Sequence, residues 1–266
     1  MNRKIAIICW NNDINISQDI ISKFPVGTTF DLFVKEGIAC IDQPEIGECI
    51  IMPTEVNIQV KAKNFVLEHY KKAGFDGWLH VLEDTIEVLK DPSQFMNDIE
   101  NCMTLLDINS YLGTVTDVCN RVYAKYNPRL RIVLDKPEYS KFDTKEILFC
   151  SHSNTQWMTF NIGKADENEL HFDDRFEIAM FWIIEYLARR RNSHPGSMYF
   201  MNQYITIPSE LGVYQNKVIN SSDKADSPEQ MKKEDAMFKE MQINYSPDNN
   251  IDIVLEKLYE KLNSKI

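Results

Sequence analysis

The sequence predicts an α/β fold, with a mixed, mainly parallel sheet flanked by helices and a helical extension at the C-terminal end. Short apolar runs alternate with segments of helical periodicity in the order strand, helix, strand, helix, strand. Several of these runs are apolar at consecutive positions, which is typical of parallel strands buried on both faces. The intervening helical segments supply the crossover connections that parallel strands need.

The elements follow from local signals along the chain. Ile5–Trp10 is an apolar run with polar flanks, and the turn at Asn11–Asp13 leads into a helix over Ile14–Phe24. Gln59–Ala73 has helical spacing and ends at Gly74, a position where glycine commonly terminates helices. Further strands are expected at Phe30–Val34, Cys49–Met52, Trp78–Leu82, Arg131–Leu134 and Ile147–Cys150, and further helices at Pro92–Leu106 and within Phe172–Arg191.

The chain is expected to form one main domain over residues 1–220, followed by two smaller parts. Residues 221–247 form a highly charged connection, and 248–266 contain an amphipathic helix. The apolar stripe of that helix suits packing on its own domain or on a neighbouring molecule, so the oligomeric state stays open.

Composition narrows the class of protein. A hydrophobic fraction of 44% in 266 residues is enough for a substantial core. A formal net charge of -11 argues against binding to duplex nucleic acid and against adsorption to an anionic membrane. The N-terminal apolar run is too short for a signal sequence, and no segment has the length needed to span a bilayer.

The six cysteines are scattered and form no CxxC pair, so zinc-ribbon and thioredoxin-type sites have no support. Several lie in apolar runs, where cysteine behaves as a small hydrophobic residue. The simplest interpretation is a reduced, cytoplasmic protein, either free or peripheral at the inner membrane.

The stretch Gly77–Thr85, GWLHVLEDT, leads a short apolar strand directly into two adjacent carboxylates, Glu83 and Asp84. In open α/β sheets, ligands bind beyond the carboxyl ends of the strands. Two neighbouring carboxylates repel each other and need a compensating partner. Mg²⁺ or Mn²⁺ would supply it and would bridge to the phosphates of a substrate. The alternative is that both carboxylates lie on a solvated turn.

Other segments resemble the large inverting family of nucleotide-sugar glycosyltransferases with the GT-A, Rossmann-type fold. Lys63-Asn64 lies in the helix before the acidic strand, where that family has a basic residue, more usually Arg, followed by Asn. Phe172–Phe176, FDDRF, resembles the family's FDxRF segment, and Glu185 with Arg189 resembles its acidic acceptor motif. The resemblance covers roughly residues 3 to 192, with these landmarks in the family's order.

The resemblance implies transfer of a sugar from a nucleoside-diphosphate donor to an acceptor hydroxyl, with inversion at the anomeric carbon. Glu83-Asp84 stands in place of the family's Asp-x-Asp, so Asp84 would be the direct metal ligand and Glu83 the second. Lys63, Asn64 and Arg175 would contact the donor, where charge develops on the diphosphate as the sugar leaves.

A carboxylate beside the acceptor hydroxyl would remove its proton. The contenders are Glu185, Asp174 and Asp173, because the family's Glu-Asp acceptor motif is Glu185-Tyr186 in this chain. Each of these carboxylates also suits a purely structural role, as an exposed side chain on a helix or as a cap at the start of the helix.

The nucleotide base is expected near the end of the first strand, at Trp10, Asn11 and Asn12, and near Lys35-Glu36 after the second strand. Trp10 would stack on the base or, alternatively, would be a core or rim aromatic residue.

The acceptor is expected near Ser151–Trp157, which combines hydrogen-bonding side chains with an aromatic ring. His152 and Trp157 are the candidate acceptor-binding residues, and an ordinary polar loop is the alternative. His80, in the acidic strand, is expected to pack in the interior, and orienting Asp84 is the alternative.

Two other functions remain open. One is a sugar nucleotidyltransferase of related architecture, although the Gly-rich N-terminal loop expected for that class is missing. The other is a degenerate, non-catalytic domain of the same fold that binds a partner. The sequence does not name the donor sugar or the acceptor, which would be a glycan, a lipid-linked molecule or another hydroxyl.

Overall fold

The computed structural model describes residues 2–10, 15–40, 42–84, 86–88, 92–106, 110–112, 130–133, 146–150, 157–165, 170–172, 197–200 and 205–206, together with 232 and 236. Its largest sheet has six strands in the order β3-β2-β1-β4-β9-β6. These are β1 (Arg3–Cys9), β2 (Phe30–Lys35), β3 (Ile46–Met52), β4 (Trp78–Glu83), β6 (Ser110–Leu112) and β9 (Trp157–Asn161).

The large sheet is mixed and mainly parallel, as the sequence predicts. β1, β2, β3 and β4 run parallel to one another. β9 is antiparallel to both of its neighbours, β4 and β6.

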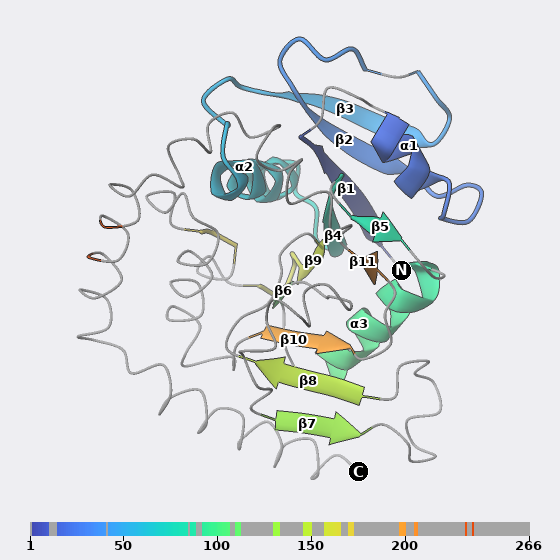
Figure 1. Ribbon diagram of the computed structural model, residues 1–266, viewed down its shortest axis with the longest axis vertical. Coiled ribbons are helices and arrows are strands. Elements are labelled where there is room, and N and C mark those ends of the chain that lie inside the picture. The colour runs from blue at the N-terminus through green and yellow to red at the C-terminus, as the bar shows by residue number, and fades with distance from the viewer. Residues whose placement is uncertain are drawn as a thin grey trace.

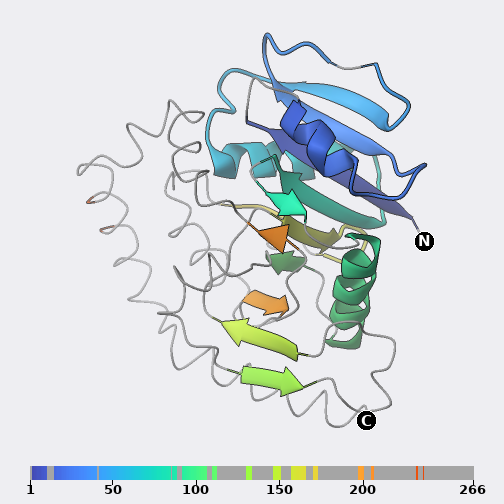
Figure 2. The ribbon, with the colours of Figure 1, turned by 45° about the vertical axis from the view of Figure 1, so that its right-hand side comes forward.

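Helices cover both faces of this sheet, which gives a three-layer α/β arrangement (Figures 1 and 2). The helices are α1 (Asn15–Ile21), α2 (Gln59–Lys72) and α3 (Pro92–Leu106). Side chains of α1 and α3 pack on one face, in a cluster with Ile5, Ile7 and Cys9 of β1. Side chains of α2 pack on the other face, in a cluster with Ala6 and Ile8. Strand alternation therefore directs the side chains of β1 into two separate cores.

Two smaller antiparallel sheets complete the described structure. One contains β10 (Ser197–Phe200), β8 (Glu146–Cys150) and β7 (Leu130–Val133), and it lies at the end of the described structure away from β2 and β3 (Figures 1 and 2). The other pairs β11 (Ile205–Thr206) with β5 (Glu87–Val88). No helix within the described residues combines the length and the apolar character that a membrane crossing requires.

Most predicted elements among the described residues have the expected type. The helix predicted at Pro92–Leu106 has these bounds in the structure, and the strand predicted at Trp78–Leu82 continues to Glu83. The first helix is shorter than predicted and ends at Ile21. The helices predicted within Phe172–Arg191 and 248–266, and nearly all of the charged connection, lie outside the described residues.

The prediction that every cysteine is reduced is wrong for one pair. Cys40, after β2, and Cys49, in β3, form a disulfide in the structure. This pair has no spacing motif in the sequence, and its two cysteines come together only when β3 pairs with β2. Cys9 is a buried free thiol, as its apolar surroundings predict.

A buried carboxylate, Asp31 of β2, ties the parallel strands to α2. It accepts hydrogen bonds from the Tyr70 hydroxyl at 2.6 Å and the Glu48 backbone N–H at 3.0 Å, and it pairs with Lys4 at 3.0 Å. Position 47 must be glycine here, since a Cβ atom would lie 2.7 Å from Asp31 Oδ1. Several donors thus satisfy the buried charge.

A second polar network lies in the core between β4, β9 and α3. His80 Nδ1 lies 3.3 Å from Trp157 Nε1 and 3.0 Å from Thr159 Oγ1. The indole N–H can only donate, so Nδ1 is the acceptor and Nε2–H donates to Glu100 Oε1 at 2.8 Å. Arg3 holds both oxygens of Glu100, at 2.7 and 2.8 Å. His80 is therefore a neutral, structural residue, as predicted.

This network makes stability depend on pH. Burial lowers the pKa of His80 below its ordinary value of 6.5, although Glu100 opposes the shift. Hydrogen bonds from His80 and Arg3 lower the pKa of Glu100 against the opposing effect of burial, which is the largest single contribution. As the pH falls below about 6.5, the unfolded chain binds a proton at position 80 that the folded chain refuses, so stability falls. Below 4.5, protonation of unfolded Glu100 lowers it further.

We expect the unfolding free energy of the wild type, measured by urea titration, to decrease from pH 7 to pH 5 with a slope approaching about 1.4 kcal/mol per pH unit. His80→Gln should reduce that slope, although it lowers stability overall. His69→Gln, at a partly exposed histidine, is the control and should keep the slope. An equal slope in wild type and His80→Gln would contradict the assignment.

Candidate functional site

The order of the parallel strands marks one edge of the sheet as a candidate site. From β1 the chain proceeds to β2 and β3 on one side, then crosses back to β4 on the other side of β1. The carboxyl ends of β1 and β4 therefore form a topological switch point, the place where open α/β sheets bind ligands. Trp10 follows β1 and Asp84 follows β4 at this point.

The strand register fixes how the ends of the three central strands align. Ile8 of β1 pairs with Glu83, and Cys9 pairs with Val34 of β2. The Asp84 backbone N–H donates to the Ile8 carbonyl at 3.1 Å, so the pairing continues one residue beyond β4. The side chains that end these strands thus gather at a single edge.

The two carboxylates of the acidic pair have different surroundings. Glu83 shares its face of β4 with Leu79 and Val81, which pack in the α2 core. Its Oε1 lies 2.6 Å from Lys63 Nζ on α2, and both side chains are almost fully buried. Burial lowers the pKa of Lys63, and the charge of Glu83 opposes that shift. Lys63 is therefore the compensating partner of Glu83.

Asp84 is also buried. Its charge shifts the pKa values of Cys9 and Lys35 at the ends of the neighbouring strands. Burial raises the pKa of Cys9 to about 12, and the charge of Asp84 adds to that shift. This thiol is consequently not a nucleophile at neutral pH. Burial lowers the pKa of Lys35, whereas Asp84 raises it. The negative charge of Asp84 therefore favours the protonated form of Lys35.

Trp10 and Lys35 form a pair at the same edge. Lys35 Nζ lies 5.6 Å from the centre of the Trp10 ring, in cation–π geometry. Trp10 is only 2% exposed and packs in the α2 core, so its ring is not available to stack on a nucleotide base. Of the two roles predicted for Trp10, the core role is the one found. Glu36, the next residue after Lys35, is exposed and accepts a hydrogen bond from the Thr54 hydroxyl at 2.6 Å.

Asn64, the residue after Lys63, contacts a distant segment. Its side-chain amide donates to the Phe172 carbonyl at 2.7 Å, and its Oδ1 accepts from the Phe172 N–H at 2.8 Å. Phe172 is fully buried in the α2 core. Consecutive residues of one helix therefore hold the end of β4 and the start of the FDDRF segment.

These contacts correct two predicted roles. Lys63 is 0% exposed and committed to Glu83, so it is not placed to meet a donor diphosphate. Asn64 uses both ends of its amide on the backbone of Phe172. Both residues therefore make internal contacts that hold the segments around the site in place.

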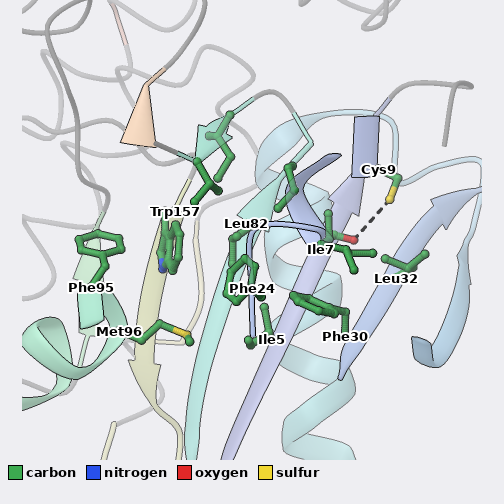
Figure 3. Packing of buried hydrophobic residues seen from close by; sticks show 14 of the residues in the cluster. Ile5, Ile7, Cys9, Phe24, Phe30, Leu32, Leu82, Phe95, Met96 and Trp157 are labelled. Atoms are coloured by element: carbon green, nitrogen blue, oxygen red, sulfur yellow. Dashed lines mark hydrogen bonds between the residues drawn. The ribbon is translucent and has the colours of Figure 1, made fainter. Parts of the chain in front are cut away.

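The acceptor prediction fails at Trp157. This residue lies in β9, not in a polar loop, and is 0% exposed between Phe95 and Phe24 (Figure 3). Its ring has no face available for a sugar. Asn11, Asn12, His152, Asp173, Asp174, Arg175 and Glu185 lie outside the described residues, so their predicted roles stay predictions.

Lys35 lies at this edge, where it was predicted together with Glu36 to lie near the nucleotide base, although no role was predicted for its charge. The available signal was its position as the first polar residue after the apolar run of β2, at the end of a buried parallel strand. What the pattern does not contain is the strand order, which brings the end of β2 close to that of β4.

The divalent-cation site predicted at this edge has to be tested against the surroundings of its two predicted ligands, Glu83 and Asp84. No group of three or more His, Cys, Asp or Glu residues that would hold a metal occurs within the described residues. Glu83 does not fit the predicted ligand role, because Lys63 occupies its carboxylate. Asp84 is likewise 0% exposed in the structure, and its predicted role as a ligand of Mg²⁺ or Mn²⁺ stays a prediction.

Comparison with known proteins gave no match, either to a protein-family model or to a curated protein sequence.

The Lys63–Glu83 pair predicts a clear pattern of stabilities. Lys63→Met should destabilise the protein by about 3–5 kcal/mol, because it leaves a buried carboxylate without its cation. Adding Glu83→Leu should recover part of that loss, since the double variant buries no charge there. Urea unfolding of the two single variants and the double variant measures the coupling.

Lys72→Met is the control, at an exposed i,i+4 pair with Glu68, and should change stability by less than about 1 kcal/mol. Additive effects of the Lys63 and Glu83 substitutions would show that the two charges do not interact.

The Asn64 contact predicts loss of local order at Phe172. Asn64→Leu removes the side-chain partners of the Phe172 N–H and C=O, so we expect a loss of about 2–4 kcal/mol and faster hydrogen exchange of the Phe172 amide. Asn97→Leu is the control, at an exposed side chain that accepts from Arg3 Nη2. Unchanged exchange at Phe172 in Asn64→Leu would count against the contact.

Proposed function

We propose that the chain is a glycosyltransferase that moves a sugar from a nucleoside-diphosphate donor to an acceptor hydroxyl, with inversion at the anomeric carbon. The observation that carries the proposal is the position of Asp84. It is a carboxylate that follows β4 at the switch point of a mainly parallel sheet. This is the position where an α/β sheet binds a ligand, and the chemistry there suits a diphosphate with its cation.

A second observation supports the same proposal. The GT-A resemblance rests on segments far apart in the sequence, among them Lys63-Asn64, Glu83-Asp84 and the segment that begins at Phe172. In the structure the first of these contacts both of the others directly. Segments that resemble one family's landmarks only by chance would have no reason to meet in the fold.

The proposed chemistry needs few groups from the chain. As the sugar leaves, negative charge grows on the leaving diphosphate and must be stabilised where it develops. A divalent cation, when bound at Asp84, supplies Lewis-acid stabilisation of that charge. Lys35 adds a positive charge at the same edge. Among the predicted bases, Glu185, Asp174 and Asp173, the accepting carboxylate would take the proton of the acceptor hydroxyl.

The test is calorimetric titration of UDP and GDP, each with and without Mn²⁺, on the wild type and on Asp84→Asn. We expect one of these nucleotides to bind in the presence of Mn²⁺ and Asp84→Asn to weaken that binding at least about tenfold. Asp76→Asn is the matched control, since Asp76 is an exposed carboxylate near the opposite end of β4. It should bind like the wild type.

Two results would contradict the proposal. If UDP, GDP, CMP and TDP all fail to bind, the edge is not a donor site. If a nucleotide binds and Asp84→Asn binds it equally well, the donor site lies elsewhere. Nucleotide binding without metal-dependent hydrolysis of any nucleotide-sugar would favour the degenerate, non-catalytic alternative.

A further inference from the structure

We propose that the Cys40–Cys49 disulfide is a redox-regulated site, which a dithiol reductant opens while the rest of the fold stays intact. Opening it releases the connection between β2 and β3, which consists of residues 36–45, from its attachment to β3. The apolar surface that this connection covers then becomes more accessible to water. The inference goes beyond the proposed function and does not depend on it.

The connection does for β2 and β3 what a helix does for most parallel strands. Because the two strands are parallel, it must return from the carboxyl end of β2 to the start of β3. Such a return usually takes a crossover of a dozen or more residues, most often a helix. The described residues of this shorter connection contain no helix. Its Ile38 packs, together with Cys49, against the cluster that contains Phe30 and Leu32. The connection itself therefore covers part of the sheet.

The connection is held at both ends independently of the disulfide. Near its start, Glu36 accepts a hydrogen bond from the Thr54 hydroxyl at 2.6 Å. At its end, the Glu45 carbonyl accepts from the Phe30 N–H at 2.8 Å. The disulfide attaches the middle of the connection to the middle of β3. If this bond breaks, the middle is released while both ends stay in place, so the opening is local.

The two sulfur atoms differ in their access to a reductant. Cys40 is exposed and Cys49 is half-buried, so an incoming thiolate reaches the sulfur of Cys40 more readily. Attack there forms a mixed disulfide with Cys40, and Cys49 leaves as a thiolate. The second thiolate of the reductant then attacks the reductant's own sulfur in the mixed disulfide, and Cys40 leaves. The protein gains two electrons and two protons, and the dithiol becomes a disulfide.

Reduction should act first on β3. This strand is the last in the described order of the large sheet, so β2 is its neighbour on one side only. Leu32 of β2 pairs in register with Cys49 and is 0% exposed. Without the cross-link the connection regains conformational freedom, and this freedom favours states in which it leaves the sheet. The amides of β3 should then exchange at least about tenfold faster than in the oxidised protein.

The test treats the folded protein with dithiothreitol, labels free thiols with iodoacetamide and follows hydrogen exchange by mass spectrometry. We expect Cys40 and Cys49 to become labelled without denaturant, and exchange to rise at Ile46–Met52. Cys9 is a buried free thiol, so it should stay unlabelled and report that the core is intact. Removing the dithiol and adding oxidised glutathione should restore slow exchange, because thiol–disulfide exchange is reversible.

The double variant Cys40→Ser with Cys49→Ser is the matched control for the reductant. It should exchange at β3 like the reduced wild type, and dithiothreitol should cause no further change. Three wild-type results would overturn the proposal: no reduction without denaturant, reduction with unchanged exchange at β3, or exchange that rises equally in α2 and β4. The last result would mean that the disulfide holds the whole fold together. These wild-type measurements decide the proposal even if the double variant does not fold.

Discussion

The buried pair of Lys63 and Glu83 is the interaction on which the candidate site depends. Taking two charges out of water is so unfavourable that each is retained only with the other in contact. At 2.6 Å, with both side chains almost fully buried, this pair fixes α2 against the end of β4. Asn64, next in the helix, then fixes Phe172 against the same turn of α2. The arrangement of the edge follows from these contacts.

The pair also separates two carboxylates that look equivalent in the sequence. Successive residues of a strand point to opposite faces, so Glu83 turns toward α2 and the following residue turns away from it. Glu83 finds its cation in a dedicated lysine, whereas Asp84 shares the strand ends with Cys9 and Lys35. One carboxylate thus serves the fold, and the other remains suited to a ligand.

The sequence predicted the parallel part of the sheet well, because its strands are continuous apolar runs and its helices have clear periodicity. It missed β9, since the polar run before Trp157 suggested a loop, and Thr159 interrupts the apolar pattern. Thr159 is polar because it faces His80, and that contact exists only after β9 inserts beside β4. A partner so far away in the chain leaves no local signal.

Site roles were harder to predict than elements, for a related reason. A lysine in the helix before an acidic strand is compatible with a ligand contact and with an internal ion pair, and only the direction of its side chain decides. Lys63 faces the core, so its charge is used inside the protein. The charge of Lys35 had no predicted role. Asp84, whose charge acts on it, lies two strands away in the sheet and 49 positions later in the chain.

The same pair explains why position 83 holds a glutamate. An aspartate at position 83 would be one methylene shorter than glutamate, and its carboxylate would lie farther from the Lys63 ammonium at that buried contact. Glutamate is therefore the residue that the ion pair requires. A cation that also binds phosphate oxygens and water needs as few as one carboxylate from the protein. Under the proposed function Asp84 would supply that carboxylate, while Glu83 serves the fold through its ion pair with Lys63.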